Sequence, residues 1–557
     1  MTEWDSTFDV VIVGSGGGGM VAALAAADAG ASTLVLEKQE KIGGSTCMSG
    51  GILWVPNNSV MRAAGEADSY EDALIHFETV VGDVGACSSL ERRSAFLTAG
   101  PQMVDFLIGL GIRLVYCRGY SDYYSSAKGG HDVGRGIEPV PYNGRKLGPW
   151  LEKLQPGLAQ SLGLSVMTNE ARSLSNYNRS LRAFAISARV VMRTAAARIR
   201  RQALLTNGAS LIAQALKVAL ERGVSVWTEA PLEDLIVEDG RVVGVRTVRD
   251  GSPVLIRATR GVLLASGGFA HNSEMRQQYG GDQPNKGRWT MSNAGDTGEV
   301  IQTAMRLGAK TDLMDEAWWL PSPKTGRFAQ STLDQARQRP RTMYVDAAGQ
   351  RFVNESNSYM EVGKAMYARN KTSKAVPCWL IFDDRYRKRY AHQRSRPGHF
   401  PKSLHESGLL KQAPTLEELA IQCEIDPQGL ADTVAHFNEG ARQGIDPDYD
   451  RGESAYNRAL GDPNRRVHPC LGPLDEAPYY AVQVLPGDIG TCGGLVTNEH
   501  AQVVGQDDQP IEGLYATGNG TATVMGRHYL GPGASIANTM VFGYVAALHA
   551  MGQGQEG

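Results

Sequence analysis

The 557-residue sequence lacks the features that define several classes of protein. Its seven cysteines are odd in number and include no C-x-x-C pair, which favours free thiols in a reducing compartment over a disulfide framework. No apolar run approaches the length of about 18 residues that a membrane-spanning helix needs. The N-terminus carries acids where a signal peptide needs basic residues. We therefore expect a cytoplasmic protein without a transmembrane segment.

An excess of charge of one sign is also missing. The sequence has 56 Lys and Arg against 59 Asp and Glu, so its overall charge does not indicate a nucleic-acid partner. The 11 His residues lack the spacing of a metal-ligand set, and no G-x-S-x-G motif occurs. The length exceeds that of one hydrophobic core and predicts two folding units, while 42% hydrophobic and 21% charged residues are typical of a globular enzyme.

Glycine is abundant, with 65 residues, and its first cluster follows a β-branched run over residues 9–13 that predicts a buried strand. A helix over 20–29 and a second strand over 33–36 follow. In this context G-x-G-x-x-G is typical of a dinucleotide site, because the glycines let a pyrophosphate approach the helix N-terminus and an acid after the second strand binds the ribose. The alternative is an Ala- and Gly-rich packing helix. The predicted site residues of this motif are Gly14, Gly16, Gly17, Gly19 and Glu37.

Further glycine-rich segments favour FAD over NAD. One lies at 43–51, and predicted strands over 261–265 and 513–517 each end in a glycine loop. Three strands that each end in a glycine loop and converge on one ligand suit FAD, the longer of the two dinucleotides. A helix predicted over 536–550, which the glycine-containing segment 531–535 opens, would stabilise charge at the flavin pyrimidine edge. Another glycine-to-helix turn starts at 296. The additional predicted cofactor residues are Gly43, Gly44, Ser45, Thr46, Gly50, Gly51, Asp296, Gly518, Asn519, Ala534, Ser535 and Ile536.

The positions of these motifs predict an α/β fold, in which a Rossmann-like FAD-binding domain is interrupted by an inserted α+β substrate or catalytic domain. Nucleotide-binding segments lie near both ends of the chain, and Trp, Pro, Arg and Tyr become frequent after Asp315. We place the FAD-binding domain at 1–315 and 488–557 and the insert at 316–487. A small sheet on the FAD-binding domain is predicted from three strands at 224–227, 235–237 and 242–248.

The segment from Arg172 to Arg201 holds eight Arg and no acid. On a helical wheel its arginines fall on one side and its apolar residues on the other. A basic amphipathic helix favours contact with a membrane surface, here the inner face of the cell membrane. The alternative is a helix whose apolar side packs on the domain while its arginines face water. The arginines on the first side are Arg182, Arg189, Arg193 and Arg200, and the apolar residues opposite are Phe184, Ala188, Val191, Met192, Ala195 and Ile199.

Tyrosines near the glycine loops are the candidate catalytic groups. A Tyr hydroxyl donates a hydrogen bond to an oxyanion or, with a lowered pKa, removes a proton. Tyr529 is the strongest candidate, because it precedes Gly533 by four residues at the start of the helix aimed at the flavin. Its hydroxyl and the Gly533 N–H would form a two-donor site for a carbonyl oxygen. Each of the others, taken alone, is better explained as a half-buried core residue; they are Tyr120, Tyr123, Tyr124 and Tyr359.

Longer motifs run from the first strand to the last helix: VVIVGSGGGG, GGSTCMSGGILWVPNN, GYSDYY, QRFVNES, CGGLVTN, GLYATGN and MGRHYLGPGASIANTMVFGYVAA. Together they resemble the 3-ketosteroid Δ1-dehydrogenases, a family within the fumarate-reductase-like flavoproteins. The FAD motifs are shared by the whole superfamily, whereas the tyrosines and MG-x-x-Y-x-G-x-G narrow the resemblance to this family. The Arg-rich segment is its least familiar part.

The resemblance implies noncovalent FAD and a 3-ketosteroid substrate in steroid or sterol degradation. Tyr529 and the N–H of Gly533 would bind the carbonyl at carbon 3 and stabilise the enolate. Tyr359 would remove the proton from carbon 2, with support from Tyr123 by hydrogen bonding. Tyr123 is preferred to Tyr124 because it directly follows the acid of GYSDYY. Flavin N5 would take the hydride from carbon 1, and an acceptor such as a quinone would reoxidise the flavin.

The sequence departs from the family pattern at Leu530, where Pro is common, and at Ala537-Asn538, where Gly-Pro is common. These departures leave the two hydrogen-bond donors, the Tyr529 hydroxyl and the Gly533 N–H, in place. They leave open which shape of substrate the site accepts. The nearest alternatives are a steroid desaturase acting at carbons 4 and 5 and a fumarate-type reductase, for which Arg527 and His528 are nominal candidates. An alternative from a different class is a non-catalytic flavoprotein for electron transfer or membrane assembly, which the basic helix suggests.

Overall fold

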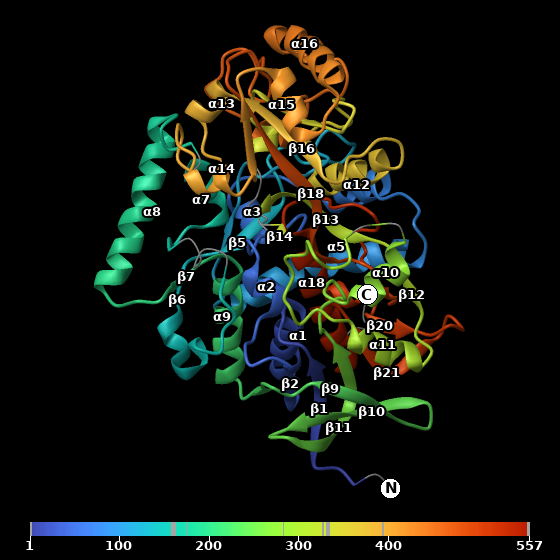
Figure 1. Cartoon of the computed structure of the whole chain (residues 1–557). Coiled ribbons are helices and arrows are strands. Elements are labelled where there is room, and N and C mark those ends of the chain that lie inside the picture. Colours follow the sequence, from blue (N-terminus) through green and yellow to red (C-terminus); the bar gives the residue numbers. More distant parts are fainter. Residues whose placement is uncertain are drawn as a thin grey trace.

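The computed structural model describes residues 3–157, 163–174, 176–281, 283, 285–325, 328–329, 335–392 and 395–553 (Figure 1). Both predicted domains include residues outside this set. For the FAD-binding domain these are 1–2, 158–162, 175, 282, 284 and 554–557, of which 175 belongs to the Arg-rich segment, and for the insert they are 326–327, 330–334 and 393–394. The chain contains two large sheets. A mainly parallel sheet lies in the lower half of Figure 1, and an antiparallel sheet lies in the upper half.

The larger sheet has the parallel centre that the first glycine motif predicts. Its strand order is β20 (Gln502–Val504), β21 (Pro510–Ala516), β11 (Ser252–Leu264), β1 (Ser6–Val13), β2 (Thr33–Leu36) and β8 (Ser225–Trp227). All neighbours from β21 to β8 are parallel, while β20 is antiparallel to β21. The three strands predicted to end in glycine loops, β1, β11 and β21, are therefore adjacent, which confirms the predicted fold class.

The prediction of a small three-stranded sheet on the FAD-binding domain is wrong in one respect. β9 (Leu232–Glu238) and β10 (Arg241–Arg249) form a hairpin that extends β11. β8 instead joins the edge of the parallel sheet beside β2, with Val226 opposite Val35. The residue pattern identifies a strand but not its partner, which here depends on the preceding crossover helix α9 (Asn207–Glu221).

Two helices approach each other closely beside the parallel sheet. α1 (Gly17–Asp28) packs against α18 (Ala534–Ala550) and against α9. A Cβ at Gly18 would lie 2.6 Å from the Thr539 carbonyl oxygen, and a Cβ at Gly543 would lie 2.4 Å from the Gly18 oxygen. Backbones this close leave no room for side chains. The N-terminus of α1 therefore lies against the N-terminal half of α18.

The antiparallel sheet comes from the chain between the two halves of the parallel sheet. Its order is β14 (Phe328–Ala329), β13 (Ala317–Thr325), β18 (Tyr479–Thr491), β16 (Cys378–Asp383) and β15 (Thr342–Val345), and β17 (Leu410–Ala413) also pairs with β18. α12 (Tyr359–Asn370) packs on β13, while α15 (Leu416–Cys423) and α16 (Pro427–Gln443) pack together at the top of Figure 1. β18 runs past residue 487, so the predicted domain boundaries stay a prediction.

Shorter elements connect these layers. Three small sheets are β3 (Leu53–Trp54), β5 (Gly136–Pro139) and β4 (Leu114–Tyr116); β6 (Tyr142–Asn143) and β7 (Leu204–Leu205); and β12 (Thr311–Asp312) and β19 (Gly494–Leu495). Further helices are α2 (Gly44–Met48), α3 (Ser59–Ala63), α4 (Tyr70–Val80), α5 (Leu90–Gly109), α10 (Ser273–Gly280), α11 (Glu299–Arg306), α13 (Asp384–Arg389), α14 (Lys402–Glu406) and α17 (Ala455–Ala459).

The Arg-rich segment folds as two helices, α7 (Thr168–Leu174) and α8 (Leu181–Ile199). α8 lies at the left edge of Figure 1, and its apolar side faces outward. Four of its large apolar side chains are between 56% and 83% exposed. They are Phe184, Val191, Met192 and Ile199.

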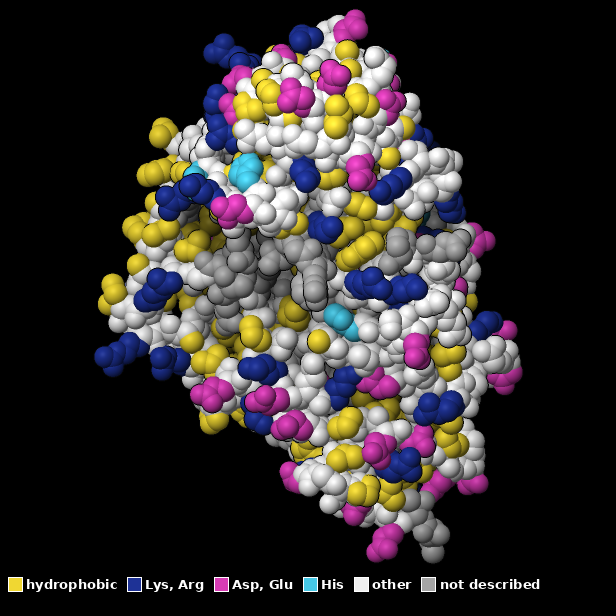
Figure 2. Space-filling view, viewed as in Figure 1, with side chains coloured by type: hydrophobic (Ala, Val, Ile, Leu, Met, Phe, Trp, Pro, Cys, Tyr) yellow, Lys and Arg dark blue, Asp and Glu magenta, His cyan; other side chains and the backbone are white. Residues whose placement is uncertain are grey.

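The arginines of α8 explain this orientation. Arg193 pairs with the buried Glu170 at 2.5 Å, and Arg189 contacts the same acid at 3.2 Å. The alternative in which the apolar side packs on the domain is therefore wrong. Figure 2 shows hydrophobic side chains, interspersed with Lys and Arg, along the edge where Figure 1 places α8. Throughout the described residues, no helix is both long and apolar enough to cross a membrane.

Candidate active site

The first glycine motif forms a tight turn at the carboxyl end of β1. Gly14 has a φ of +110°, and a Cβ there would lie 2.2 Å from the carbonyl oxygen of Ala265, just after β11. A Cβ at Gly19 would be 2.0 Å from the Gly14 oxygen. Gly16 differs, because a Cβ there would have only the Thr46 hydroxyl of the described residues within 4 Å, at 3.8 Å. Gly16 therefore faces open space at the N-terminus of α1, where an anion is favoured.

Glu37 lies beside this turn, directly after β2. Its carboxylate accepts hydrogen bonds from the Ser15 hydroxyl at 2.6 Å, the Ser15 N–H at 3.3 Å and the Gln39 N–H at 2.9 Å. The side chain is buried. These contacts hold the carboxylate at the carboxyl end of the parallel strands, where the acid of this motif binds ribose hydroxyls.

The second glycine loop folds onto the first. A Cβ at Gly44 would be 4.0 Å from the Gly16 Cα, so the two backbones run side by side. The Thr46 hydroxyl accepts a hydrogen bond from the Gly17 N–H at 3.0 Å. Gly43, with a φ of +106°, provides the turn into α2. The predicted residues of both motifs are thereby brought together at the start of α1.

Asp296 reaches the same place from a distant part of the chain. Its carboxylate accepts a hydrogen bond from the Ser45 hydroxyl at 3.1 Å, and that hydroxyl accepts one from the Asn293 N–H at 2.7 Å. Gly267 is required here, because its φ is +78° and a Cβ would lie 2.3 Å from Asp296 Oδ1. Burial raises the pKa of Asp296 to about 7. A buried acid next to two glycine loops suits a polar ligand.

Gly50 and Gly51 are placed differently from the other predicted cofactor residues. Gly51 has a φ of +72°, and a Cβ there would lie 2.4 Å from the Asn207 backbone at the start of α9. A Cβ at Gly50 would lie 3.1 Å from the Thr168 hydroxyl. Packing accounts for both glycines, and their contact with a cofactor stays a prediction.

The start of α18 forms another part of the site. Gly533 has a φ of +85°, and a Cβ there would lie 2.0 Å from the Ile52 carbonyl oxygen, so only glycine fits. The Gly533 N–H donates to no acceptor among the described residues. The first turn of α18 follows without a side-chain cap. The Ala534 N–H donates to the Gly531 carbonyl oxygen at 3.1 Å, whereas the N–H groups of Ser535 and Ile536 point out of the helix start and suit a ligand. That turn is formed by Ala534, Ser535 and Ile536.

A short 3₁₀ turn, η4 (Gly518–Gly520), follows β21 and packs on α18. Gly518 has a φ of +83°, and a Cβ there would lie 2.5 Å from the Thr539 hydroxyl. The Asn519 side-chain oxygen accepts a hydrogen bond from Trp318 Nε1 at 3.0 Å. Because Trp318 belongs to β13, this contact joins the two sheets.

Three of the predicted tyrosines meet beside the start of α18. Tyr123 lies between β4 and β5, Tyr359 opens α12, Tyr529 precedes α18, and all three are buried. Their ring centroids are 5.1 Å apart for Tyr123 and Tyr359, 5.5 Å for Tyr123 and Tyr529, and 5.2 Å for Tyr359 and Tyr529. The Tyr529 hydroxyl lies 2.9 Å from the Ser535 hydroxyl in the first turn of α18. Three segments far apart in sequence thus bring their phenols to one place.

Tyr124 points away from this group. Its hydroxyl donates to Glu361 at 2.8 Å and lies 3.2 Å from His528 Nδ1. Tyr123, rather than Tyr124, is therefore the neighbour of Tyr359. The catalytic role of Tyr123 stays a prediction.

The nominal groups of a dicarboxylate reductase are engaged by acids. Arg527 pairs with Asp315 at 2.9 Å and with Glu316 at 3.2 Å, and hydrogen bonding to Asp315 raises its pKa. His528 contacts Glu361 at 3.2 Å. Because its charge is already neutralised, Arg527 does not offer the clamp that a dicarboxylate needs.

Burial raises the pKa of Tyr123 and Tyr359 well above the ordinary value of a phenol, and contact with neighbouring phenols raises each pKa further. Both side chains are therefore neutral near pH 7 in the absence of a ligand. A base at this position needs a donor or a cation that stabilises the phenolate.

Reasoning from the sequence missed Tyr456 and the role of Trp318. The Tyr456 ring, in α17, has its centroid 4.5 Å from that of Tyr123, and Trp318 packs edge-on against Tyr529 at 5.0 Å. Tyr456 lies in the sequence GESAYN, where no glycine motif or strand marks it. The abundance of Trp after Asp315 predicts an apolar pocket but does not single out one side chain.

The parallel sheet, the glycine loops and the acid after β2 define a flavoprotein, and the sequence matches the FAD binding domain family over residues 9–536. It is 42% identical to the 3-oxosteroid 1-dehydrogenase of Mycobacterium tuberculosis, over 97% of this chain and 98% of that protein. It is 40% identical to the 3-oxosteroid 1-dehydrogenase of Mycolicibacterium smegmatis, over 97% and 96%.

A solved structure agrees with these relatives. The 3-ketosteroid Δ1-dehydrogenase from Sterolibacterium denitrificans, in complex with 1,4-androstadiene-3,17-dione, matches with a TM-score of 0.91 and 36% identity, over 98% of this chain and 100% of that chain. The chain therefore belongs to the family of FAD-dependent 3-oxosteroid 1-dehydrogenases. This confirms the family that the motifs predict.

Proposed function

We propose that this chain catalyses the FAD-dependent Δ1-dehydrogenation of 3-ketosteroids, as part of steroid or sterol degradation. The observation that carries the proposal is the meeting of Tyr123, Tyr359 and Tyr529 beside Gly533 at the start of α18. The arrangement offers two donors for a ketone oxygen and a phenol to accept a proton. The substrate class named for the relatives supports the same assignment.

The residues present fit FAD, and they come from both ends of the chain and, at Asp296, from its middle. Gly16 and the uncapped start of α1 suit the pyrophosphate, Glu37 suits the ribose, and Asp296 beside Ser45 suits a further polar part of the dinucleotide. The positive end of α18, from Ala534 onward, suits the flavin ring. When bound, FAD accepts the hydride from carbon 1 of the steroid.

Tyr529 and Gly533 would bind the ketone oxygen at carbon 3. The hydroxyl lies at the first turn of α18, and the Gly533 N–H meets no acceptor in the described part of the chain. Two donors stabilise the enolate more than the ketone, because negative charge grows on the oxygen as the proton leaves carbon 2. Packing of Trp318 on the Tyr529 ring excludes water and so strengthens both hydrogen bonds.

Tyr359 would accept the proton from carbon 2, with Tyr123 as its neighbour. Burial raises the pKa of Tyr359, so the phenol alone is a weak base at neutral pH. Tyr123 would help by donating a hydrogen bond to the phenolate oxygen. A proton and a hydride then leave adjacent carbons, and a double bond remains between carbons 1 and 2.

We also propose two domains, an FAD-binding domain at 1–315 and 488–557 that contains the parallel sheet, and a catalytic insert at 316–487 that contains the antiparallel sheet apart from the last residues of β18. Tyr359 would then come from the insert, and Tyr123 and Tyr529 from the FAD-binding domain. Ligand sites commonly lie where two domains meet. A junction would hold the steroid against the cofactor.

Anaerobic mixing of the purified protein with androst-4-ene-3,17-dione tests the proposed reaction. We expect the yellow flavin colour to bleach and the product to carry a new double bond between carbons 1 and 2. The matching 5α-reduced steroid discriminates the desaturase alternative, because it offers both positions. A new double bond between carbons 4 and 5 of the 5α-reduced steroid would contradict the proposal, as would a flavin that neither steroid bleaches. Steady turnover with an artificial acceptor would exclude a purely structural scaffold.

We further propose that α8 docks on an anionic membrane surface. The outward apolar side chains suit the boundary of the acyl chains, and exposed arginines suit anionic headgroups. Arg189 and Arg193 turn to Glu170, so they are less available to lipid. The exposed arginines are Arg182, Arg189, Arg198, Arg200 and Arg201, of which Arg189 also pairs with Glu170.

Co-sedimentation with anionic vesicles tests this docking. A triple variant that replaces Phe184, Val191 and Met192 with Ser should lose vesicle binding and keep its activity on dissolved substrate. The control is Ile421→Ser, which changes a 65% exposed apolar residue on α15. If the triple variant sediments like the unmodified protein, α8 is not the docking surface.

A quinone dissolved in the membrane is the proposed electron acceptor. A protein held at the bilayer by α8 would meet both a lipophilic quinone and a lipophilic steroid there. Reoxidation of the bleached flavin should then be faster with a quinone analogue in vesicles for the unmodified protein than for the triple Ser variant. Equal rates would contradict this link.

A further inference from the structure

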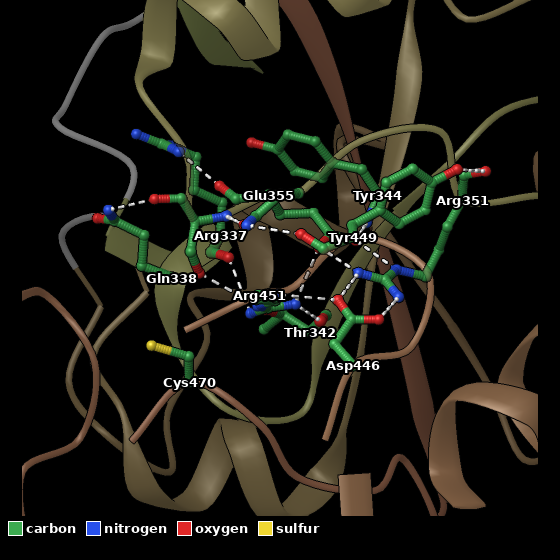
Figure 3. A network of polar contacts seen from close by, with 12 residues as sticks. Arg337, Gln338, Thr342, Tyr344, Arg351, Glu355, Asp446, Tyr449, Arg451 and Cys470 are labelled. Atoms are coloured by element: carbon green, nitrogen blue, oxygen red, sulfur yellow. Dashed lines mark hydrogen bonds and ion pairs between the residues drawn. The ribbon is translucent and has the colours of Figure 1, made fainter. Parts of the chain in front are cut away.

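A buried network of ion pairs and hydrogen bonds precedes α12 in the chain, and Figure 3 shows its side chains. Glu355 is at its centre: its carboxylate accepts hydrogen bonds from Arg351 at 2.9 Å and contacts Arg451 at 3.2 Å. Arg351 also pairs with Asp446 at 2.8 Å. Glu355 precedes Tyr359 by four residues. The network therefore holds the chain just before α12.

Arg337 connects this network to the phenols. It lies in η3 (Gln335–Gln338) and is only 4% exposed. Its Nη1 donates to the carbonyl oxygens of Glu355 and Asn357, the second at 2.6 Å, and its Nη2 donates to the Tyr456 hydroxyl at 3.4 Å. The Tyr456 ring in turn packs on that of Tyr123 at 4.5 Å. The side-chain nitrogens of Arg337 thus link two backbone carbonyls to one phenol.

The acids beside Arg337 are engaged by other cations. Glu355 pairs with Arg351 and Arg451, and no carboxylate among the described residues lies within ion-pair distance of the Arg337 guanidinium. Glu361, on the far side of the tyrosines, contacts Tyr124, His528 and Lys364. A buried guanidinium without a carboxylate partner favours the ionised form of the nearest group that can become an anion.

The titratable and charged groups of the tyrosine cluster come from five different segments of the chain. They are Tyr123 between β4 and β5, Tyr359 on α12, Tyr456 on α17, Tyr529 before α18 and Arg337 on η3. Burial raises the pKa of Tyr123 and Tyr456, and the other phenols raise that of Tyr123 further. Arg337 acts on both in the opposite direction. It is the single cation among these groups.

We propose that Arg337 is a positioning residue for the proton transfer, and that its buried charge, acting through Tyr456 and Tyr123, stabilises the phenolate form of the tyrosine cluster. The inference rests on the proposed function, in which the Tyr359 oxygen accepts the proton from carbon 2. As a phenolate, Tyr359 forms an O–H bond while the C–H bond breaks, and the proton leaves the protein between turnovers. The charge of Arg337 raises the fraction of protein that holds this phenolate.

The pH dependence of turnover tests the inference. Arg337→Gln removes the cation, so the phenolate forms at higher pH, and the ascending limb of kcat should move up by about one pH unit, which is about a tenfold loss below the limb. Arg337→Lys keeps the charge and should leave the limb near its original pH. The ultraviolet difference absorbance of tyrosinate, recorded in holoenzyme without steroid, should move in the same way.

A matched control removes a cation that does not face the phenols. Arg369 lies on α12, like Tyr359, and pairs with Asp346 at 2.7 Å. Arg369→Gln should leave both the ascending limb and the tyrosinate titration in place. If it moves them as far as Arg337→Gln does, a general loss of charge explains the shift and the inference is overturned.

A folded Arg337→Gln protein with an unmoved limb would also overturn the inference. If that variant does not fold, Tyr456→Phe decides, since it keeps the guanidinium and its carbonyl contacts but removes the phenol between Arg337 and Tyr123. The Tyr456 phenol by itself raises the pKa of Tyr123, so its loss without a link to Arg337 would move the limb down. We expect the limb to move up, as in Arg337→Gln, and a limb that is unmoved or moves down refutes the proposal. Failure of the proposed function is seen separately, because the unmodified protein would then form no Δ1 product, whereas the tyrosinate titration needs no steroid.

Discussion

Replacing Tyr529 with Phe removes one hydroxyl and leaves the packing of the site intact. The ring packs on Trp318 at 5.0 Å, Tyr359 at 5.2 Å and Tyr123 at 5.5 Å between centroids, and Phe can keep all three contacts. The hydroxyl loses its partner Ser535, 2.9 Å away. Loss of such a hydrogen bond lowers the free energy of unfolding by about 1 kcal/mol. We therefore expect a folded variant that still binds FAD.

The rate should change far more than the stability. One donor to an oxyanion in a buried site contributes about 3 kcal/mol to the transition state, so kcat should fall by about 100-fold or more. The Gly533 N–H remains as a second donor, so activity should not vanish. KM should change less than kcat, because the donor binds the enolate more tightly than the ketone.

Steady-state turnover of a 3-ketosteroid with an artificial acceptor, together with flavin content and thermal melting, checks this expectation. Tyr515→Phe is the matched control, since it removes a hydroxyl that bonds His549 at 2.9 Å. Ser535→Ala shows whether the loss arises through the serine instead. If Tyr529→Phe keeps the original kcat with its flavin bound, Tyr529 does not hold the ketone oxygen.

Three further expectations concern the base, the cofactor and a buried acid. Tyr359→Phe should lower kcat by about 100- to 10,000-fold and stop exchange of the carbon 2 proton with solvent deuterium; exchange at the original rate would exclude Tyr359 as the base. Glu37→Ala should weaken FAD binding by about 10-fold or more, measured by flavin fluorescence on reconstitution, and an unchanged Kd would remove Glu37 from the site. Burial raises the pKa of Asp296 from 3.8 to about 7, so between these pH values the carboxyl is protonated in the folded state and ionised in the unfolded state. The free energy of unfolding of the flavin-free protein should therefore fall by up to about 4 kcal/mol as pH rises from about 4 to about 7. Asp296→Asn should flatten this dependence in thermal melting, and an equally steep curve in the variant would assign the effect to other groups.

The cofactor-binding part of the fold, around the first glycine turn, could be predicted from the sequence because its constraints are local. Gly14 and Gly19 face each other within one turn, and the strand, turn and helix follow in order. The same signal is ambiguous at Gly51, where the close approach is to α9 and not to the first glycine turn. β8 shows the same limit, since its residues indicate a strand while its partner β2 is set by the crossover.

The tyrosine cluster could not be predicted from the residues alone. Tyr123, Tyr359 and Tyr529 are separated by long stretches of chain, and only the resemblance to a family placed them together. Tyr456 and Arg337 belong to no motif, and they reach the cluster only through tertiary contacts, in which Arg337 donates to the Tyr456 hydroxyl and the Tyr456 ring packs on Tyr123. A contact of this kind is a property of the tertiary structure, so its detection requires coordinates.

α8 shows how one distant residue decides the meaning of a helical pattern. A helical wheel divides the apolar from the basic side but does not say which side faces the protein. Glu170, on α7, pairs with Arg193 and Arg189 at one margin of the basic side, and the apolar side therefore meets solvent. Exposed apolar area is unfavourable by about 25 cal/mol per Å², so such a face is stabilised by whatever covers it. Glu170→Gln should free both arginines and so weaken the orientation of α8, and vesicle binding by this variant separates the effect of helix orientation from that of the apolar side chains themselves.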